Sequence, residues 1–101
     1  MTENQLEELF EKHSEDEYLE FERIQNPKHT RRDICAMLII HEIQSRNESQ
    51  RQDTMISWAG HEEIYLDVNV EEISEYITEE EIIDLIRCGV RLEESNFAMF
   101  I

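Results

Sequence analysis

The fold is decided by residues 61–101, which read HEEIYLDVNVEEISEYITEEEIIDLIRCGVRLEESNFAMFI. Apolar side chains alternate with polar ones at Ile64, Leu66 and Val68, which is the period of a half-buried strand. Two more short strands are predicted at the other end of the stretch, on either side of a polar turn at residues 93–96. Their apolar residues are Val90 and Leu92, then Phe97, Met99 and Ile101.

Two helices are predicted between these strands. Asn69 and Thr78 are each followed three residues later by a glutamate, which is the pattern of a capping box at a helix N-terminus. Gly89 ends the second helix, because glycine adopts the left-handed conformation that commonly follows a last helical turn. Residues 61–101 are therefore predicted to form a β-α-α-β-β unit.

The N-terminal half is predicted to be helical. Apolar residues at helical spacing predict helix over residues 3–24, with Thr2 as its N-cap. A capping box beginning at Ser14 predicts a break there, and one unbroken helix is the alternative. After a proline-containing connection, a cap beginning at Thr30 opens a helix over residues 31–46. This helix is apolar around most of its circumference, so we expect it to be covered on more than one face.

The segment between the two halves is predicted to be a mobile loop over residues 47–57, because it is polar and has no periodicity. Met55, Ile56 and Trp58 either cover an edge of the core or form an exposed patch beside that loop. A chain of 101 residues is long enough for one modest core. We therefore predict one α+β domain, 1–101, with N-terminal helices packed on the small C-terminal unit.

Charge dominates the composition, with 25 acidic residues against nine basic ones and a net charge of −16. Residues 1–22 carry −8, residues 23–53 carry +2 and residues 54–101 carry −10. Such a surface repels nucleic acid and anionic membranes and attracts basic protein surfaces, although solubility alone is the alternative explanation. The residues predicted to bind a partner are Glu71, Glu72, Glu75, Glu79, Glu80, Asp84 and Trp58.

Catalytic, cofactor and metal sites are not predicted. The four histidines and two cysteines lack the close pairs that zinc sites use. Cys35 and Cys88 are expected to be inert buried thiols, and His41 is expected to be a partly buried core residue. The acidic runs fall in the first turns of predicted helices, where the helix dipole favours them for structural reasons.

The strings HEEIYLDV (61–68) and LIRCGVR (85–91) resemble small uncharacterised acidic proteins encoded by phages and prophages. The resemblance covers about the C-terminal 40 residues and brings no catalytic residue with it. It implies residence in bacterial cytoplasm and an accessory role in infection or lysogeny. A cytoplasmic location is also expected because the N-terminus lacks a signal peptide and no apolar run is long enough to span a membrane.

We therefore expect a non-enzymatic accessory protein that binds a basic protein surface and does not bind nucleic acid directly. A narrower version is a nucleic-acid mimic that inhibits a host factor. One alternative is a structural or assembly protein, for example a homodimer, in which Met55, Trp58 and an apolar edge strand at Phe97–Ile101 pair between copies. The other is an enzyme without a recognisable motif.

Overall fold

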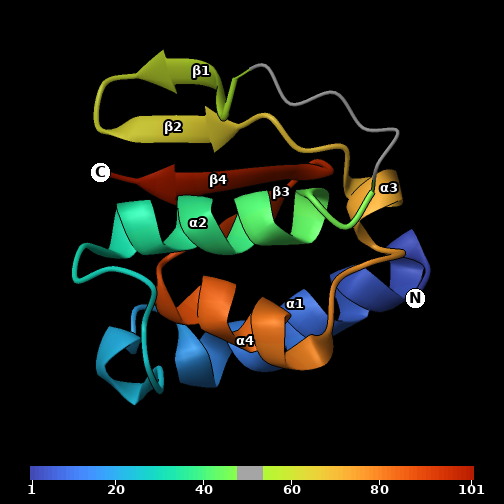
Figure 1. The fold of residues 1–101 in the computed structure, drawn as a ribbon, viewed down its shortest axis with the longest axis horizontal. Coiled ribbons are helices and arrows are strands. Elements are labelled where there is room, and N and C mark those ends of the chain that lie inside the picture. The colour runs from blue at the N-terminus through green and yellow to red at the C-terminus, as the bar shows by residue number, and fades with distance from the viewer. Residues whose placement is uncertain (48–53) are drawn as a thin grey trace.

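The computed structural model describes residues 1–47 and 54–101 as helices packed on one four-stranded antiparallel sheet (Figure 1). The class is α+β, as predicted. In chain order the elements are α1 (Glu3–Glu17), η1 (Phe21–Arg23), α2 (Arg32–Gln44), β1 (Ile56–Gly60), β2 (Glu63–Leu66), α3 (Val70–Ile73), α4 (Glu79–Arg87), β3 (Arg91–Glu93) and β4 (Asn96–Phe100).

The sheet has the strand order β1-β2-β4-β3. Ile64 of β2 lies opposite Met99 of β4, and Leu66 lies opposite Phe97, so the alternating apolar residues point to one inner face. The predicted β-α-α-β-β unit is confirmed as β2, α3, α4, β3 and β4. β1 was not predicted, and it takes up the end of the segment that was expected to be a loop. Residues 48–53 of that segment lie outside the described residues.

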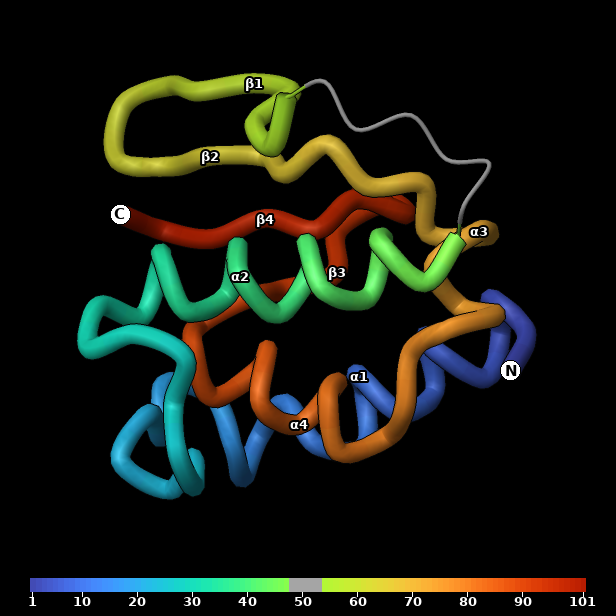
Figure 2. Tube along the Cα trace, in the orientation of Figure 1, coloured from blue at the N-terminus to red at the C-terminus, as the bar shows by residue number. Residues whose placement is uncertain are grey.

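The helices cover the inner face of the sheet. In Figure 2 α2 lies over β4, while α4 and α1 lie side by side farther from the strands. Phe10 of α1 reaches the sheet, with its ring centroid 5.4 Å from that of Phe97. The core fills the space between these layers. Its fully buried side chains include Leu6, Cys35, Ile40, Ile43, Leu66, Ile82, Leu85, Ile86, Phe97 and Met99.

Both C-terminal helices begin where their local signals predict, and α4 also ends where predicted. The Asn69 side chain accepts a hydrogen bond from the backbone N–H of Glu72, 3.1 Å away, although α3 ends sooner than expected, at Ile73. Thr78 and Glu81 form a reciprocal capping box at α4. Gly89 has φ +99°, and the next backbone N–H returns to the carbonyl of Leu85 at 3.0 Å. This bond completes a Schellman motif.

The predicted break at Ser14 is wrong. Ser14 lies inside α1, and its hydroxyl donates to the carbonyl oxygen of Phe10. The helix ends at Glu17, and the predicted helix over 3–24 is divided into α1 and η1. The chain turns at Leu19, which has φ +63° and donates its backbone N–H to the carbonyl of Ile86, 3.2 Å away. A contact with α4, far away in the sequence, therefore decides where α1 stops.

α2 differs from its prediction in two ways. Thr30 does not cap it; Arg31 is in the N-cap position and makes no capping hydrogen bond with its side chain. His41 is exposed, as is Leu38, so the prediction of a partly buried His41 is wrong. The sheet and α4 bury one broad side of the helix, and the opposite side faces solvent.

The C-terminal strand is not an edge. β4 lies between β2 and β3 and pairs with both of them. The premise of the alternative in which Phe97–Ile101 is open to another strand is therefore wrong. The edges of the sheet are β1 and β3.

Candidate functional site

Most of the acidic residues predicted to bind a partner lie on α3, on the turn after it and on the first turn of α4. Glu71, Glu72, Glu75, Glu79 and Glu80 all have exposed side chains. Their placement follows from the local sequence, because the caps at Asn69 and Thr78 start the two helices just before these acids. Carboxylates in a first helical turn are also favoured by the positive end of the helix dipole.

α1 adds further carboxylates to this surface. Glu3 lines a shallow depression of about 360 Å³ together with Glu71 and Glu75. Glu8 lines a neighbouring depression of about 450 Å³ together with Glu79. We call the combined surface the acidic helical face. It consists of Glu3, Glu8, Glu71, Glu72, Glu75, Glu79 and Glu80.

Three basic groups lie at this face. The N-terminal ammonium group of Met1 donates to the carbonyl of Ser74 at 3.0 Å, and Met1 lines both depressions. His13 of α1 has its Nε2 atom 2.8 Å from Oε2 of Glu79, and the glutamate side chain remains 48% exposed. Lys12 lines the same depression as Glu8 and Glu79. Within the described residues, Glu71, Glu72, Glu75 and Glu80 form no ion pair, and their side chains are exposed to solvent.

Asp84 was predicted as part of the partner-binding set, but the fold gives it another contact. Its Oδ1 atom accepts a hydrogen bond from Nη1 of Arg87 at 3.2 Å, and burial raises the pKa of its carboxyl group even though Arg87 acts in the opposite direction. Arg87 also donates from Nε to Glu17 at 2.5 Å, which lowers the pKa of that glutamate. Asp84 therefore belongs to an internal group that joins α4 to the end of α1.

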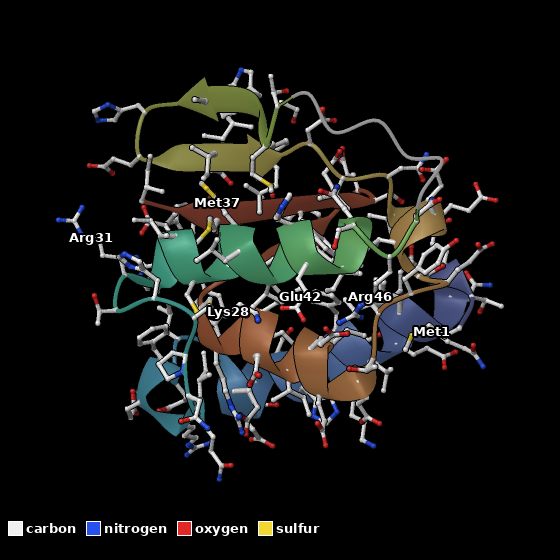
Figure 3. All side chains as sticks on the ribbon, viewed as in Figure 1. Met1, Lys28, Arg31, Met37, Glu42 and Arg46 are labelled. Carbon is white, nitrogen blue, oxygen red and sulfur yellow. The ribbon has the colours of Figure 1, made fainter. Side chains whose placement is uncertain are left out.

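Positive charge from the middle of the chain is also engaged in ion pairs within the molecule. Figure 3 shows Lys28, Glu42 and Arg46 lying between α2 and α4, whereas Arg31 extends away from the start of α2. Lys28 and Arg46 both pair with Glu42, and Arg46 also pairs with Glu81. The Lys28 and Arg46 side chains remain 40% and 36% exposed, so these pairs neutralise the two cations at the surface and do not bury them.

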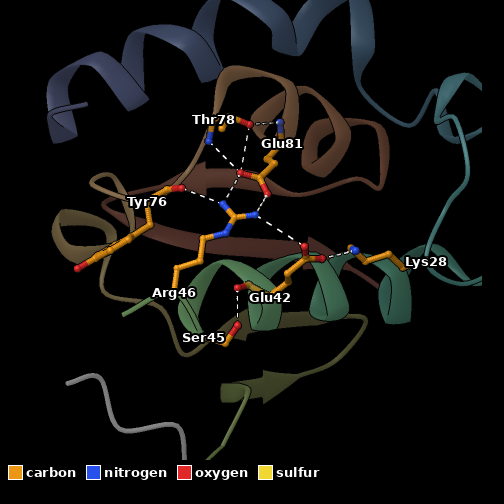
Figure 4. Close-up of polar contacts among 7 residues, drawn as sticks. All are labelled: Lys28, Glu42, Ser45, Arg46, Tyr76, Thr78 and Glu81. Carbon is orange, nitrogen blue, oxygen red and sulfur yellow. Dashed lines mark hydrogen bonds and ion pairs between the residues drawn. The ribbon is translucent and has the colours of Figure 1, made fainter. Parts of the chain in front are cut away.

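Arg46 makes the most extensive of these contacts (Figure 4). It holds Glu81 with two bonds, Nη1–Oε1 at 2.9 Å and Nη2–Oε2 at 2.6 Å, and it also donates to the carbonyl of Tyr76 at 2.9 Å. Burial alone would raise the pKa of Glu81, but its bonds with Arg46 and with the backbone of Thr78 outweigh burial and lower it. Glu81, which completes the capping box of α4, therefore also holds Arg46 just beyond the end of α2.

Trp58 does not belong to the acidic helical face. It lies on β1, at the edge of the sheet remote from α1 and α4, as the strand positions in Figure 1 show. Its ring is 53% exposed and meets Tyr65 of β2 edge-on, with 5.4 Å between centroids. The fold thus separates the predicted set into an acidic surface and an isolated aromatic residue.

The histidines and cysteines do not form a reactive group. Among the described residues, no three His, Cys, Asp or Glu side chains are arranged to hold a metal ion. Cys35 and Cys88 are fully buried, and burial strongly raises the pKa of the Cys88 thiol, which keeps it protonated and unreactive. His41 and His61 are exposed and lie on different elements.

Glu3 and Glu8 were not among the predicted site residues. The signal that could have identified them was the acidic side of the first helix, but only the packing of α1 against α4 places that side beside Glu71 and Glu79. In the described part of the chain, every helix is too short or too polar to cross a lipid bilayer.

Comparison with known proteins adds no relative. The chain matches no known protein-family model, and neither curated proteins nor solved structures show significant similarity to it.

Proposed function

We propose that this protein is a non-enzymatic accessory protein that binds a basic surface of another protein through its acidic helical face. The observation that carries the proposal is that Glu71, Glu72, Glu75 and Glu80 are exposed on neighbouring helical turns and form no ion pair with any described residue. Such a surface attracts a cationic partner over a distance and raises the rate of association, and this attraction weakens as salt is added.

The internal ion pairs support this proposal. Arg46 and Arg87 each bind two carboxylates, and Lys28 binds one, so they offer little charge to compensate the acidic helical face. If negative charge served solubility alone, its position would not matter. The proposal requires that partner binding depend more on the carboxylates of this face than on equally exposed carboxylates elsewhere.

The experiment compares two triple variants with the same change in net charge. Glu71→Gln, Glu72→Gln and Glu75→Gln neutralise the acidic helical face. The matched control neutralises three exposed acids outside it: Glu22→Gln, Glu62→Gln and Asp67→Asn. Tagged proteins are used to capture partners from the cytoplasm of a bacterial host, and the captured proteins are identified and quantified.

We expect the wild type and the control triple to capture the same basic protein, and the face triple to lose most of it. Raising the salt concentration should release the partner from all variants, because screening shortens the range of the attraction. Equal capture by both triples would refute the proposal. Equal loss by both would show that total charge, and not this face, is responsible.

The narrower version of the proposal is mimicry of nucleic acid, in which the carboxylates of the face occupy the positions of phosphates on a DNA-binding or RNA-binding protein. Its test is competition with the captured partner. Excess wild-type protein should displace DNA or RNA from that partner, and the face triple should not. A captured partner that keeps its nucleic acid in the presence of excess protein would exclude mimicry while leaving binding to a basic surface intact.

A further inference from the structure

The two edges of the sheet are protected to different degrees. β3 has three residues, and its Arg91 pairs with Glu93 at 2.6 Å and with Glu63 of β2. Short length and charged side chains are two ways in which native proteins prevent an edge strand from pairing with another chain. β1 has five residues, Ile-Ser-Trp-Ala-Gly, and none of them is charged. Within residues 1–47 and 54–101, the one protective feature of β1 is an irregularity in register between Ile56 and Trp58.

The lack of charge at β1 extends beyond the strand. Residues 54–60 contain no charged side chain, in a chain in which 34% of residues are charged. Ile56 is 41% exposed and Trp58 is 53% exposed. The side of β1 away from β2 pairs with no other strand of the described residues. Apolar side chains and unpaired backbone groups are thus exposed together along one edge.

We propose that this edge pairs with β1 of a second copy of the chain, antiparallel, so that two four-stranded sheets become one sheet of eight strands. An uncharged strand has no group that would select a basic or an acidic segment. Its best match is another uncharged strand with exposed apolar side chains, and β1 itself has that character. Antiparallel pairing of identical edges is an isologous contact with twofold symmetry, so it closes at two copies.

The distribution of charge permits this contact. Each copy carries −16, but β1 is at the border of the molecule opposite α1 and α4, with α3 at an intermediate height beside the sheet (Figure 1). At physiological ionic strength charges are screened beyond about 8 Å. Described acids near β1 are Glu63, which is paired with Arg91, Glu62 in the hairpin turn, and exposed Asp67, whose backbone N–H donates to the carbonyl of Met55 just before the strand. The remaining repulsion should decrease as salt is added.

Trp58 reports directly on this contact. It is the only tryptophan in the chain, and its ring lies across Gly60, where a Cβ atom would collide with it. Twofold pairing of β1 would bring the Trp58 side chains of two copies to the same face of the joined sheet. Their emission should therefore shift to shorter wavelength as the dimer forms and the rings lose water.

The test measures sedimentation and Trp58 fluorescence of the full chain over a wide range of concentration, at low and high salt. The wild type should change from monomer to dimer, with the emission shift over the same range, and dimerisation should strengthen at high salt. This salt dependence is opposite in sign to that of the proposed basic partner, so the two proposals succeed or fail separately.

Ile56→Lys places a charge on the edge strand and should weaken dimerisation by at least about tenfold, because lysine is a common protection against edge pairing. Ser57→Lys is a second variant with an already exposed side chain, in case Ile56→Lys does not fold. The matched control is Leu19→Lys, an equally drastic change at a side chain that is 45% exposed and lies beside α4, away from the sheet edge. It should dimerise like the wild type.

Two results would overturn the proposal. One is a wild-type protein that stays monomeric at the highest concentration in high salt. The other is a dimer that forms equally well with Ile56→Lys and Ser57→Lys in folded proteins, because its interface would then lie elsewhere.

Discussion

Helices α4 and α2 both contribute fully buried residues to the core, yet they are defined in opposite ways. α4 has a reciprocal capping box at its start and a Schellman motif closed by Gly89 at its end. α2 has no side-chain cap at its start, and beyond its end Arg46 is bound to the cap of α4. α4 is therefore specified by its local sequence, whereas α2 is specified by the elements that it packs against.

The largest expected effect is the loss of packing from α2. Ile40 is fully buried, so Ile40→Ala should lower the free energy of unfolding by about 2–5 kcal/mol, through lost apolar burial and a residual cavity. Leu38→Ala, on the exposed side of the same helix, should cost less than about 1 kcal/mol. Urea unfolding followed by circular dichroism measures both. Equal losses of unfolding free energy would mean that the buried side of α2 contributes no more to stability than its exposed side.

The next effect concerns the end of α4. Gly89→Ala should destabilise the fold by about 1–3 kcal/mol, because φ is +99° there and alanine disfavours that conformation. The added Cβ would also lie 2.7 Å from Cδ2 of Leu19 and 2.9 Å from Nη1 of Arg32. Thermal and urea unfolding measure the loss. A variant as stable as the wild type would show that the end of α4 does not depend on its local sequence.

The bond that joins the two helices should make stability depend on pH. Glu81→Gln should cost about 1 kcal/mol near neutral pH, since it removes a charge-assisted pair with Arg46 that is partly exposed to solvent. The pKa of Glu81 is lowered below its ordinary value of 4.5 by folding. Its contribution is therefore fully present above that value and disappears as pH falls through the lower pKa of the folded state.

The measurement is the difference in unfolding free energy between wild type and Glu81→Gln, taken at several pH values from neutral to strongly acidic. We expect the difference to shrink only below the ordinary glutamate pKa. A difference that is constant over this range would mean that the carboxylate charge of Glu81 does not stabilise the fold.

The smallest effects come from removing the N-cap side chain of α4 and adding one to α2. Thr78→Ala should destabilise the protein by about 1 kcal/mol, because it leaves a backbone N–H of α4 without its acceptor. Arg31→Asp should stabilise it by about 0.5–1 kcal/mol, since Arg31 has the extended backbone of an N-cap but supplies no capping oxygen. Unfolding curves of the two variants should move in opposite directions. If both variants shifted the unfolding curve in the same direction, the inferred difference in N-capping between α4 and α2 would be wrong.

The same difference explains which sequence predictions succeeded. The caps at Asn69 and Thr78 and the glycine at position 89 are local signals, and the helices that they predict are present. The sequence that begins at Ser14 matches the capping-box pattern as well as a true N-cap does. The predicted cap fails because α1 continues through it until Leu19 bonds to α4. Leu19 and Ile86 are far apart in the sequence, so this hydrogen bond cannot be predicted from neighbouring residues.

The sequence by itself determined the α+β class, the C-terminal β-α-α-β-β unit and the excess of acidic side chains, because these depend on periodicity, caps and composition. The tertiary structure alone decided that Ile56–Gly60 is a strand, that β4 is interior and that Glu3 and Glu8 lie beside Glu71 and Glu79. The physical reason is that strand pairing and helix packing join residues that are distant along the chain. Their partners are chosen by the shape and hydrogen bonds of the assembled core.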